Sequence, residues 1–229
     1  MVNAGQQLLL DGVVSRRLQD SVQLTLHNFE LAPFSQFTSS MGYRVDGRTN
    51  GSATMKAVLG AGEVQADIVV DSISINDLAV PSIWLRSRWD FIQNRAGILV
   101  QQRENLDTLV RGFYAPSQKR YYARATLDAV ELSALDPLLK GVVERTGGNA
   151  DVDIALRGSG KEANLSGQIA VRDFTTTVDF TQVTYTMPRA VIEVKNNHLI
   201  AEGVPLYDPE KNEGLFSIDL NLEHLSNIF

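Results

Sequence analysis

Strict alternation of apolar and polar residues is the feature that most constrains how this chain folds. It is clearest at residues 22–26 and 216–223, where every second residue is apolar. Successive side chains of a β-strand point to opposite faces of a sheet, so a period of two places the apolar set on one face. Short turn signals separate these runs and predict antiparallel meanders. The signals are Asn50-Gly51, Gly60-Ala61-Gly62, Gly147-Gly148-Asn149, Gly158-Ser159-Gly160, Asn196-Asn197 and Asp208-Pro209.

Two stretches lack the alternation, residues 33–43 and 134–143. In the second, Leu135, Leu138, Leu139 and Val142 have helical spacing, so we expect a short helix or turn in each stretch. Trp84 to Trp89 alternates and is predicted as a strand.

The chain also repeats itself with a period of about 100 residues. Residues 25–31 match 126–132, and residues 64–70 match 165–171, both 101 positions apart. Met55, Ala57 and Leu59 align best with Val152, Ile154 and Leu156, 97 positions on, which implies a loop deletion followed by a hairpin insertion. We predict the end of a preceding unit at 1–21, units at 22–122 and 123–219, and the start of a third at 220–229.

Composition excludes several classes of protein. The net charge is −6 without a basic block, which argues against a nucleic-acid partner. The chain has no cysteine, so it has no disulfide or thiolate metal site. No stretch approaches 18 apolar residues, and no signal peptide is visible. Both ends resemble cuts through a longer protein.

Catalytic and cofactor motifs are weak, and we expect no enzyme activity, no metal and no cofactor. His27, His198 and His224 lack the spacing of metal ligands. Gly158-Ser159-Gly160-Lys161 is interpreted as a hairpin turn rather than a phosphate loop. The acidic stretch Asp208 to Gly214 is interpreted as a solvated turn rather than a Ca²⁺ loop. Tyr114, Tyr121 and Tyr122, beside Lys119 and Arg120, are interpreted as strand surface rather than a base-stacking site.

The pattern of strands and turns resembles that of the TamB family, within the AsmA-like group of bridge-like lipid transfer proteins. Residues 121–127 lead into 130–132 and a short apolar stretch, and 148–156 resemble the family's hairpin entry. Residues 165–171 match its "L-x-G-x-h-x-h" strand, where h is apolar. Residues 199–208 with 214–218 resemble its closing unit, but the final Gly of that unit is replaced near Ser217 to Asp219 and its loop is longer.

The resemblance implies a β-taco, a curled antiparallel sheet with an apolar interior. Family members are anchored in the inner membrane and cross the periplasm toward an outer-membrane barrel of the TamA/BamA type. They are linked to phospholipid transport and to outer-membrane protein assembly. We therefore expect a periplasmic segment whose apolar groove holds phospholipid acyl chains. The groove candidates are Leu24, Leu26, Met55, Leu59, Val64, Ile68, Val70, Leu127, Val152, Ile154, Leu156, Leu165, Ile169 and Val171.

Three alternatives remain open. Alternating strands also build a closed β-sandwich, in which the apolar face is core. A surface adhesin or structural β-repeat module would need no lipid at all. An enzyme on a β scaffold is the least favoured.

Overall fold

A computed structural model gives the fold of the chain and describes residues 5–34, 44–59, 63–76, 78–90, 92–160 and 162–222. Several sequence predictions lie outside these residues. They are the turn at Gly60-Ala61-Gly62, most of the 33–43 stretch, Lys161, His224 and most of the predicted third unit.

The described residues form β-strands almost throughout, as the alternation predicts. Helical structure is confined to short turns, and the helix or turn predicted within 134–143 is found at 132–139. The elements are β1 (Gln7–Gly12), β2 (Ser21–Glu30), η1 (Ala32–Phe34), β3 (Val45–Lys56), β4 (Glu63–Ile75), β5 (Leu78–Val80), β6 (Ile83–Asp90), β7 (Arg95–Gln102), β8 (Thr108–Ala115), η3 (Pro116–Gln118), β9 (Arg120–Glu131), η4 (Leu132–Leu135), α2 (Asp136–Leu139), β10 (Val143–Ser159), β11 (Glu162–Val178), β12 (Val183–Lys195), β13 (His198–Tyr207) and β14 (Glu213–Asn221).

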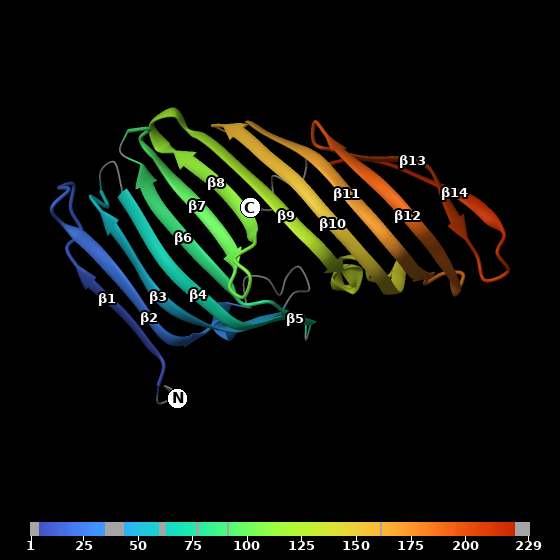
Figure 1. Cartoon of the computed structure of the whole chain (residues 1–229), viewed down its shortest axis with the longest axis horizontal. Coiled ribbons are helices and arrows are strands. Elements are labelled where there is room, and N and C mark those ends of the chain that lie inside the picture. Colours follow the sequence, from blue (N-terminus) through green and yellow to red (C-terminus); the bar gives the residue numbers. More distant parts are fainter. Residues whose placement is uncertain are drawn as a thin grey trace. The chain divides into compact units, whose positions relative to one another are not determined.

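The strands pair in chain order to form one antiparallel sheet of fourteen strands, with β5 pairing only with β4 (Figure 1). This confirms the all-β fold of repeated meanders. The closed sandwich is wrong, because a sandwich needs two sheets packed face to face. The described strands belong to a single sheet instead.

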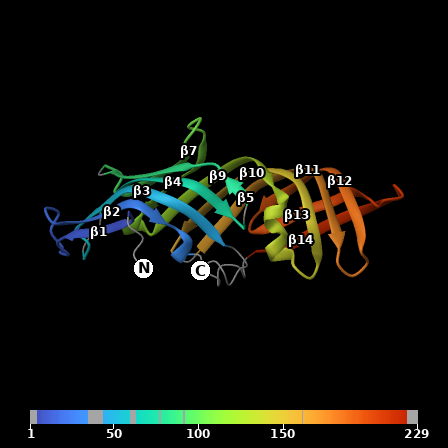
Figure 2. The ribbon, with the colours of Figure 1, turned by 90° about the horizontal axis from the view of Figure 1, so that it is seen from below.

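The chain divides into two compact units, Met1–Ala123 and Arg124–Phe229. Their boundary falls one residue from the sequence repeat boundary at 122/123. Figure 2 shows the ribbon of these units from a second direction.

The two units share their backbone irregularities at a constant spacing of 101 residues. Asn28 and Ala129 both have positive φ (47° and 52°), and so do Ser72 and Asp173 (54° and 51°). The Asn28 N–H donates to Asn50 Oδ1 at 2.8 Å, and the Ala129 N–H donates to Asp151 Oδ1 at 3.0 Å. Such β-bulges locally bend a strand and fix its pairing, so their recurrence supports the β-repeat character of the chain.

The predicted offset of 97 for the third strand of each unit is wrong. Met55 pairs with Val64 in the first unit, and Leu156 pairs with Leu165 in the second, so Met55 corresponds to Leu156. The spacing is again 101, and no loop deletion is needed. The error is a shift of four residues, and an even shift leaves a period-two pattern unchanged.

Two predicted turns are also wrong, because their glycines lie inside strands. Asn50-Gly51 lies within β3, and Gly147-Gly148-Asn149 lies within β10. At Gly51 a Cβ would lie 2.1 Å from the Asp67 carbonyl oxygen, so glycine is needed for close strand approach. Gly148 has φ of 97° beside a register shift, which marks a bulge rather than a turn.

Candidate functional site

Strand register defines an unbroken apolar face in the first unit. Residues paired across antiparallel strands lie on the same face, so partners can be followed from strand to strand. One row crosses seven strands and holds no polar side chain. Its members are Leu8, Leu26, Gly51, Ile68, Leu85, Val100 and Val110. The neighbouring row is Leu10, Leu24, Ala53, Ala66, Ser87, Ile98 and Gly112, and Ser87 is its only polar member.

The second unit builds an equivalent face. Val152, Ile169 and Ile192 form one row across β10, β11 and β12. A parallel row consists of Ile154, Gly167, Val194, Leu199 and Leu220. None of these rows in either unit contains a charged side chain. An uncharged face is the property that contact with an acyl chain requires.

This face is only partly covered by the rest of the chain. No large side chain is fully buried among the described residues, and the most buried apolar residues are largely alanine and valine. Most of the fourteen groove candidates are half-buried; Met55 is 39% exposed, and only Val171, at 6% exposed, is buried. The apolar side chains therefore retain surface that another molecule can cover.

Of the groove candidates, Leu59 lies away from the apolar face, whereas Leu127 lies on it. Leu59 is not on the apolar face, because β3 ends at Lys56 and the chain turns at Ala57, which has φ of 48°. Leu59 is 61% exposed in this turn. Leu127 lies on β9, three residues from Arg124, whose side chain contacts Asp153 on the polar face. Because residues an odd number of positions apart on a strand point to opposite faces, Leu127 lies on the apolar face.

The apolar face of the second unit is more closed at the end where its helical turn lies. A buried cluster joins Leu132 of η4 to Ala150, Val171, Met187 and Ala190, with Ala201 and Val204 from β13. Asp136 anchors the turn, since its Oδ1 accepts the Thr146 N–H at 3.0 Å. Figure 1 shows the turn between β9 and β10.

Polar motifs that the sequence suggested take structural roles. Asp208 Oδ1 accepts the N–H groups of Glu210 and Asn212 at 2.9 and 2.8 Å, and its Oδ2 accepts Asn212 Nδ2 at 2.8 Å. These hydrogen bonds, those from Asn212 first, lower the pKa of Asp208. Gly158 and Ser159 end β10 at the β10–β11 hairpin, as predicted. His198 Nδ1 lies 2.8 Å from Asp219 Oδ1.

Neither a metal centre nor a membrane helix is found in the part of the chain that the structure describes. No three His, Asp or Glu side chains gather there in a group able to hold a metal ion. No helix within the described ranges has the length and apolar character needed to cross a membrane.

On the polar face, the sequence interpretation missed a cluster of arginines. Arg86 and Arg88 from β6 and Arg111 from β8 surround a shallow hollow, with Phe113 and Tyr122 beside them. The alternation of β6 puts Arg86 and Arg88 on one face, which the sequence could have shown. Arg111 joins them only through the pairing of β6 with β7 and of β7 with β8.

Comparison with known proteins gives no match: no protein-family model, curated protein or solved structure matches this chain.

Proposed function

We propose that this chain is a segment of an apolar β-groove that holds the acyl chains of phospholipids. The observation that carries this proposal is the uncharged apolar face, which extends over seven strands in the first unit and recurs in the second. Burying a CH₂ group contributes about 0.8 kcal/mol, so an acyl chain needs no specific polar contact to be held.

The resemblance to the TamB family extends the proposal to a cellular role. In that role the chain is a periplasmic part of an inner-membrane-anchored protein. It passes phospholipid toward the outer membrane, works with a barrel protein of the TamA/BamA type, and supports outer-membrane protein assembly. The absence of charge along the apolar rows suits lipid passage, since a carboxylate or ammonium group there would oppose entry of hydrocarbon.

Photo-crosslinking from the apolar face tests the proposal directly. A photoreactive residue replaces Ile68 in the first unit or Ile169 in the second, and the protein is irradiated in cells. Gln65 and Gln168 are matched controls, because they lie on the same strands but on the polar face. We expect phospholipid adducts at Ile68 and Ile169, with few or none at the two glutamines.

Folded protein without lipid adducts at either isoleucine would contradict the proposal. That result would favour a structural repeat module or adhesin whose apolar face is covered by protein. Adducts of equal yield on both faces would indicate nonspecific contact with membranes and would contradict it as well.

A further inference from the structure

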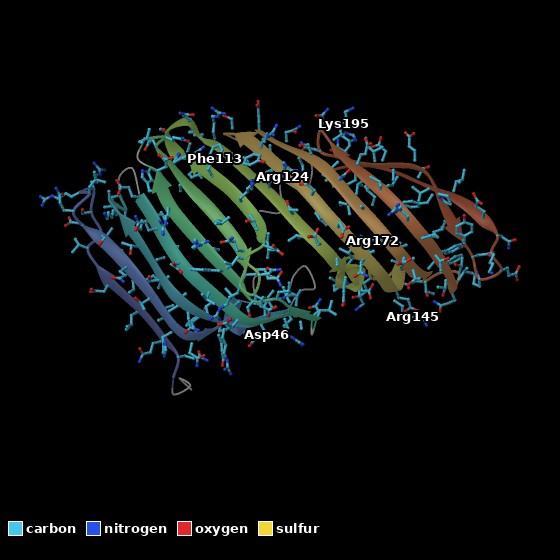
Figure 3. The ribbon with its side chains drawn as sticks, in the orientation of Figure 1. Asp46, Phe113, Arg124, Arg145, Arg172 and Lys195 are labelled. Atoms are coloured by element: carbon cyan, nitrogen blue, oxygen red, sulfur yellow. The ribbon has the colours of Figure 1, made fainter. Side chains whose placement is uncertain are left out.

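The arginine hollow on the polar face of the first unit exists because one strand position lacks a side chain. Gly97 of β7 lies between Arg88 of β6 and Phe113 of β8 in the register. The hollow has a volume of about 510 Å³, and Arg86, Arg111 and Tyr122 also line it. Figure 3 labels Phe113 among the side chains of this unit. Its floor at Gly97 is bare backbone, which an incoming chain can approach.

The hollow carries a net positive charge, because it has three arginines and one neighbouring carboxylate, Asp67. Arg88 and Arg111 are exposed and make no hydrogen bond or ion pair within the described ranges. Asp67 lies opposite Arg86 in the register, where its carboxylate also accepts the Trp84 Nε1–H at 2.6 Å, and its single negative charge offsets only one of the three arginines. An anion that reaches this surface therefore finds guanidinium groups with free donors.

Arg86 itself is held in place yet incompletely satisfied. Its guanidinium lies 4.3 Å from the centre of the Trp84 ring, and it donates to Gln101 Oε1. Its Nε is buried without a hydrogen-bond partner in the part of the chain that the structure describes. A buried donor without a partner costs free energy, so Arg86 keeps unused hydrogen-bonding capacity beside the hollow.

The three arginines leave the sheet at separated backbone positions, which suits an extended ligand. Arg86 and Arg111 lie two strands apart, about 10 Å at the usual strand spacing, and Arg86 and Arg88 lie about 7 Å apart along β6. Arg95 lies over the Phe113 ring, 4.6 Å from its centre. A single phosphate would need guanidinium groups aimed at one point. An extended peptide presents alternate side chains about 7 Å apart on one side, which matches the Arg86–Arg88 spacing.

We propose that this hollow is a docking site for an extended acidic segment of a partner protein, whose carboxylates at alternate positions pair with Arg86 and Arg88, while Arg111, two strands away, adds positive charge beside the segment. Phe113 and Tyr122, whose ring centroids are 6.1 Å apart, provide apolar surface for the side chains between or beside the carboxylates. Arginine and aromatic residues are the types enriched at protein–protein interfaces. The site lies on the polar face and does not depend on lipid binding.

The second unit lacks most of this site at the equivalent positions, where only Lys195, in place of Arg88, is basic. The row Arg86–Leu99–Arg111 corresponds to Glu193–Ile200–Asp219. His198 takes the place of Gly97, and its ring contacts Asp219. The second unit is therefore an internal negative control for the docking site.

Fluorescence anisotropy with two labelled peptides tests the proposal on the whole 229-residue chain. In one peptide Glu alternates with Ser and Tyr, and in the other Gln replaces every Glu. We expect saturable binding of the Glu peptide alone, weakened by raised salt. Arg88→Gln and Arg111→Gln should each lower affinity about three- to fivefold, and together about tenfold or more.

Two further variants separate the site from general electrostatics. Arg189→Gln removes the same charge from the polar face of the second unit and should leave the affinity unchanged. Gly97→His fills the hollow without removing any arginine, and it should abolish binding while thermal unfolding remains near that of the wild type. At Gly97 an added Cβ meets only the Arg88 carbonyl oxygen, at 3.6 Å.

Three outcomes would overturn the proposal. The first is no binding of the Glu peptide at millimolar concentration. The second is an equal loss of affinity from Arg189→Gln and Arg111→Gln. The third is competition by pyrophosphate at concentrations far below those of the peptide, which would indicate a site for a compact phosphate ligand instead.

Discussion

The two units keep the same apolar face but differ on the polar face. In the first, Arg86–Leu99–Arg111 is a basic row beside a hollow at Gly97. In the second, Glu193–Ile200–Asp219 is acidic, and two arginines of the same face are paired with carboxylates. Arg124 contacts Asp153, and Arg172 contacts Asp151. Figure 3 labels both arginines. The apolar rows thus carry what the units have in common, while the polar face distinguishes them.

The largest expected effect comes from a charge on the apolar face, and it should differ between the units. Val70 and Val171 are equivalent, but Val171 is buried within the cluster of the second unit whereas Val70 is half-buried. Val171→Asp should lower the free energy of unfolding by about 3–5 kcal/mol, and Val70→Asp by about 1–2 kcal/mol. Urea unfolding measures both.

Gln65→Asp, on the polar face of β4, is the control for added charge and should change stability by less than about 0.5 kcal/mol. Equal losses of unfolding free energy at Val70 and Val171 would show that the apolar faces of the two units are equally closed, and would contradict the difference in burial between these two valines.

A second comparison concerns glycines on the apolar face that allow neighbouring strands to pair closely. Gly51 in β3 and Gly167 in β11 have φ of 139° and 145°, and a Cβ on either would lie about 2 Å from a carbonyl oxygen of the neighbouring strand. Gly51→Ala and Gly167→Ala should each cost about 1–3 kcal/mol in thermal or urea unfolding. Gly97→Ala should be nearly neutral; a comparable loss there would contradict the steric explanation.

A smaller effect should distinguish paired from unpaired arginines. Arg124 Nε and Nη2 donate to the two oxygens of Asp153 at 2.7 and 2.5 Å, and both side chains are partly exposed. A double-mutant cycle with Arg124→Gln and Asp153→Asn should give a coupling energy of about 0.5–1 kcal/mol. Arg88→Gln should leave stability unchanged, because Arg88 has no partner in the described part of the chain. A loss from Arg88→Gln equal to that from Arg124→Gln would remove this distinction.

The smallest effect is a pH dependence confined to the Asp208 loop. Because hydrogen bonds lower the pKa of Asp208 in the folded state, its ionised form stabilises the loop above the ordinary value of 3.8. This contribution is lost as pH falls through the lowered pKa. The amide signals of Glu210 and Asn212 should therefore shift in NMR spectra only below about pH 4. Asp208→Asn should abolish that transition, and a midpoint above 4 would contradict the lowered pKa.

The sequence by itself determined the fold class, the apolar face and most of its members. A period of two is visible in one dimension, and it states which side chains share a face of their own strand. It also indicated a helical turn within 134–143, because the spacing of Leu135 and Leu139 breaks the alternation; the structure has this turn at 132–139.

Only the tertiary structure decided which strand residues are neighbours. A shift by an even number of residues leaves the alternation unchanged, so the sequence aligned Met55 with the wrong residue of the second unit. The pairing of Met55 with Val64 and of Leu156 with Leu165 shows that Met55 corresponds to Leu156. Glycines such as Gly51 serve equally for turns and for close strand contact, and the choice depends on the neighbouring backbone. The arginine hollow likewise joins β6 to β8, which are brought together by hydrogen-bonded register and not by any local pattern.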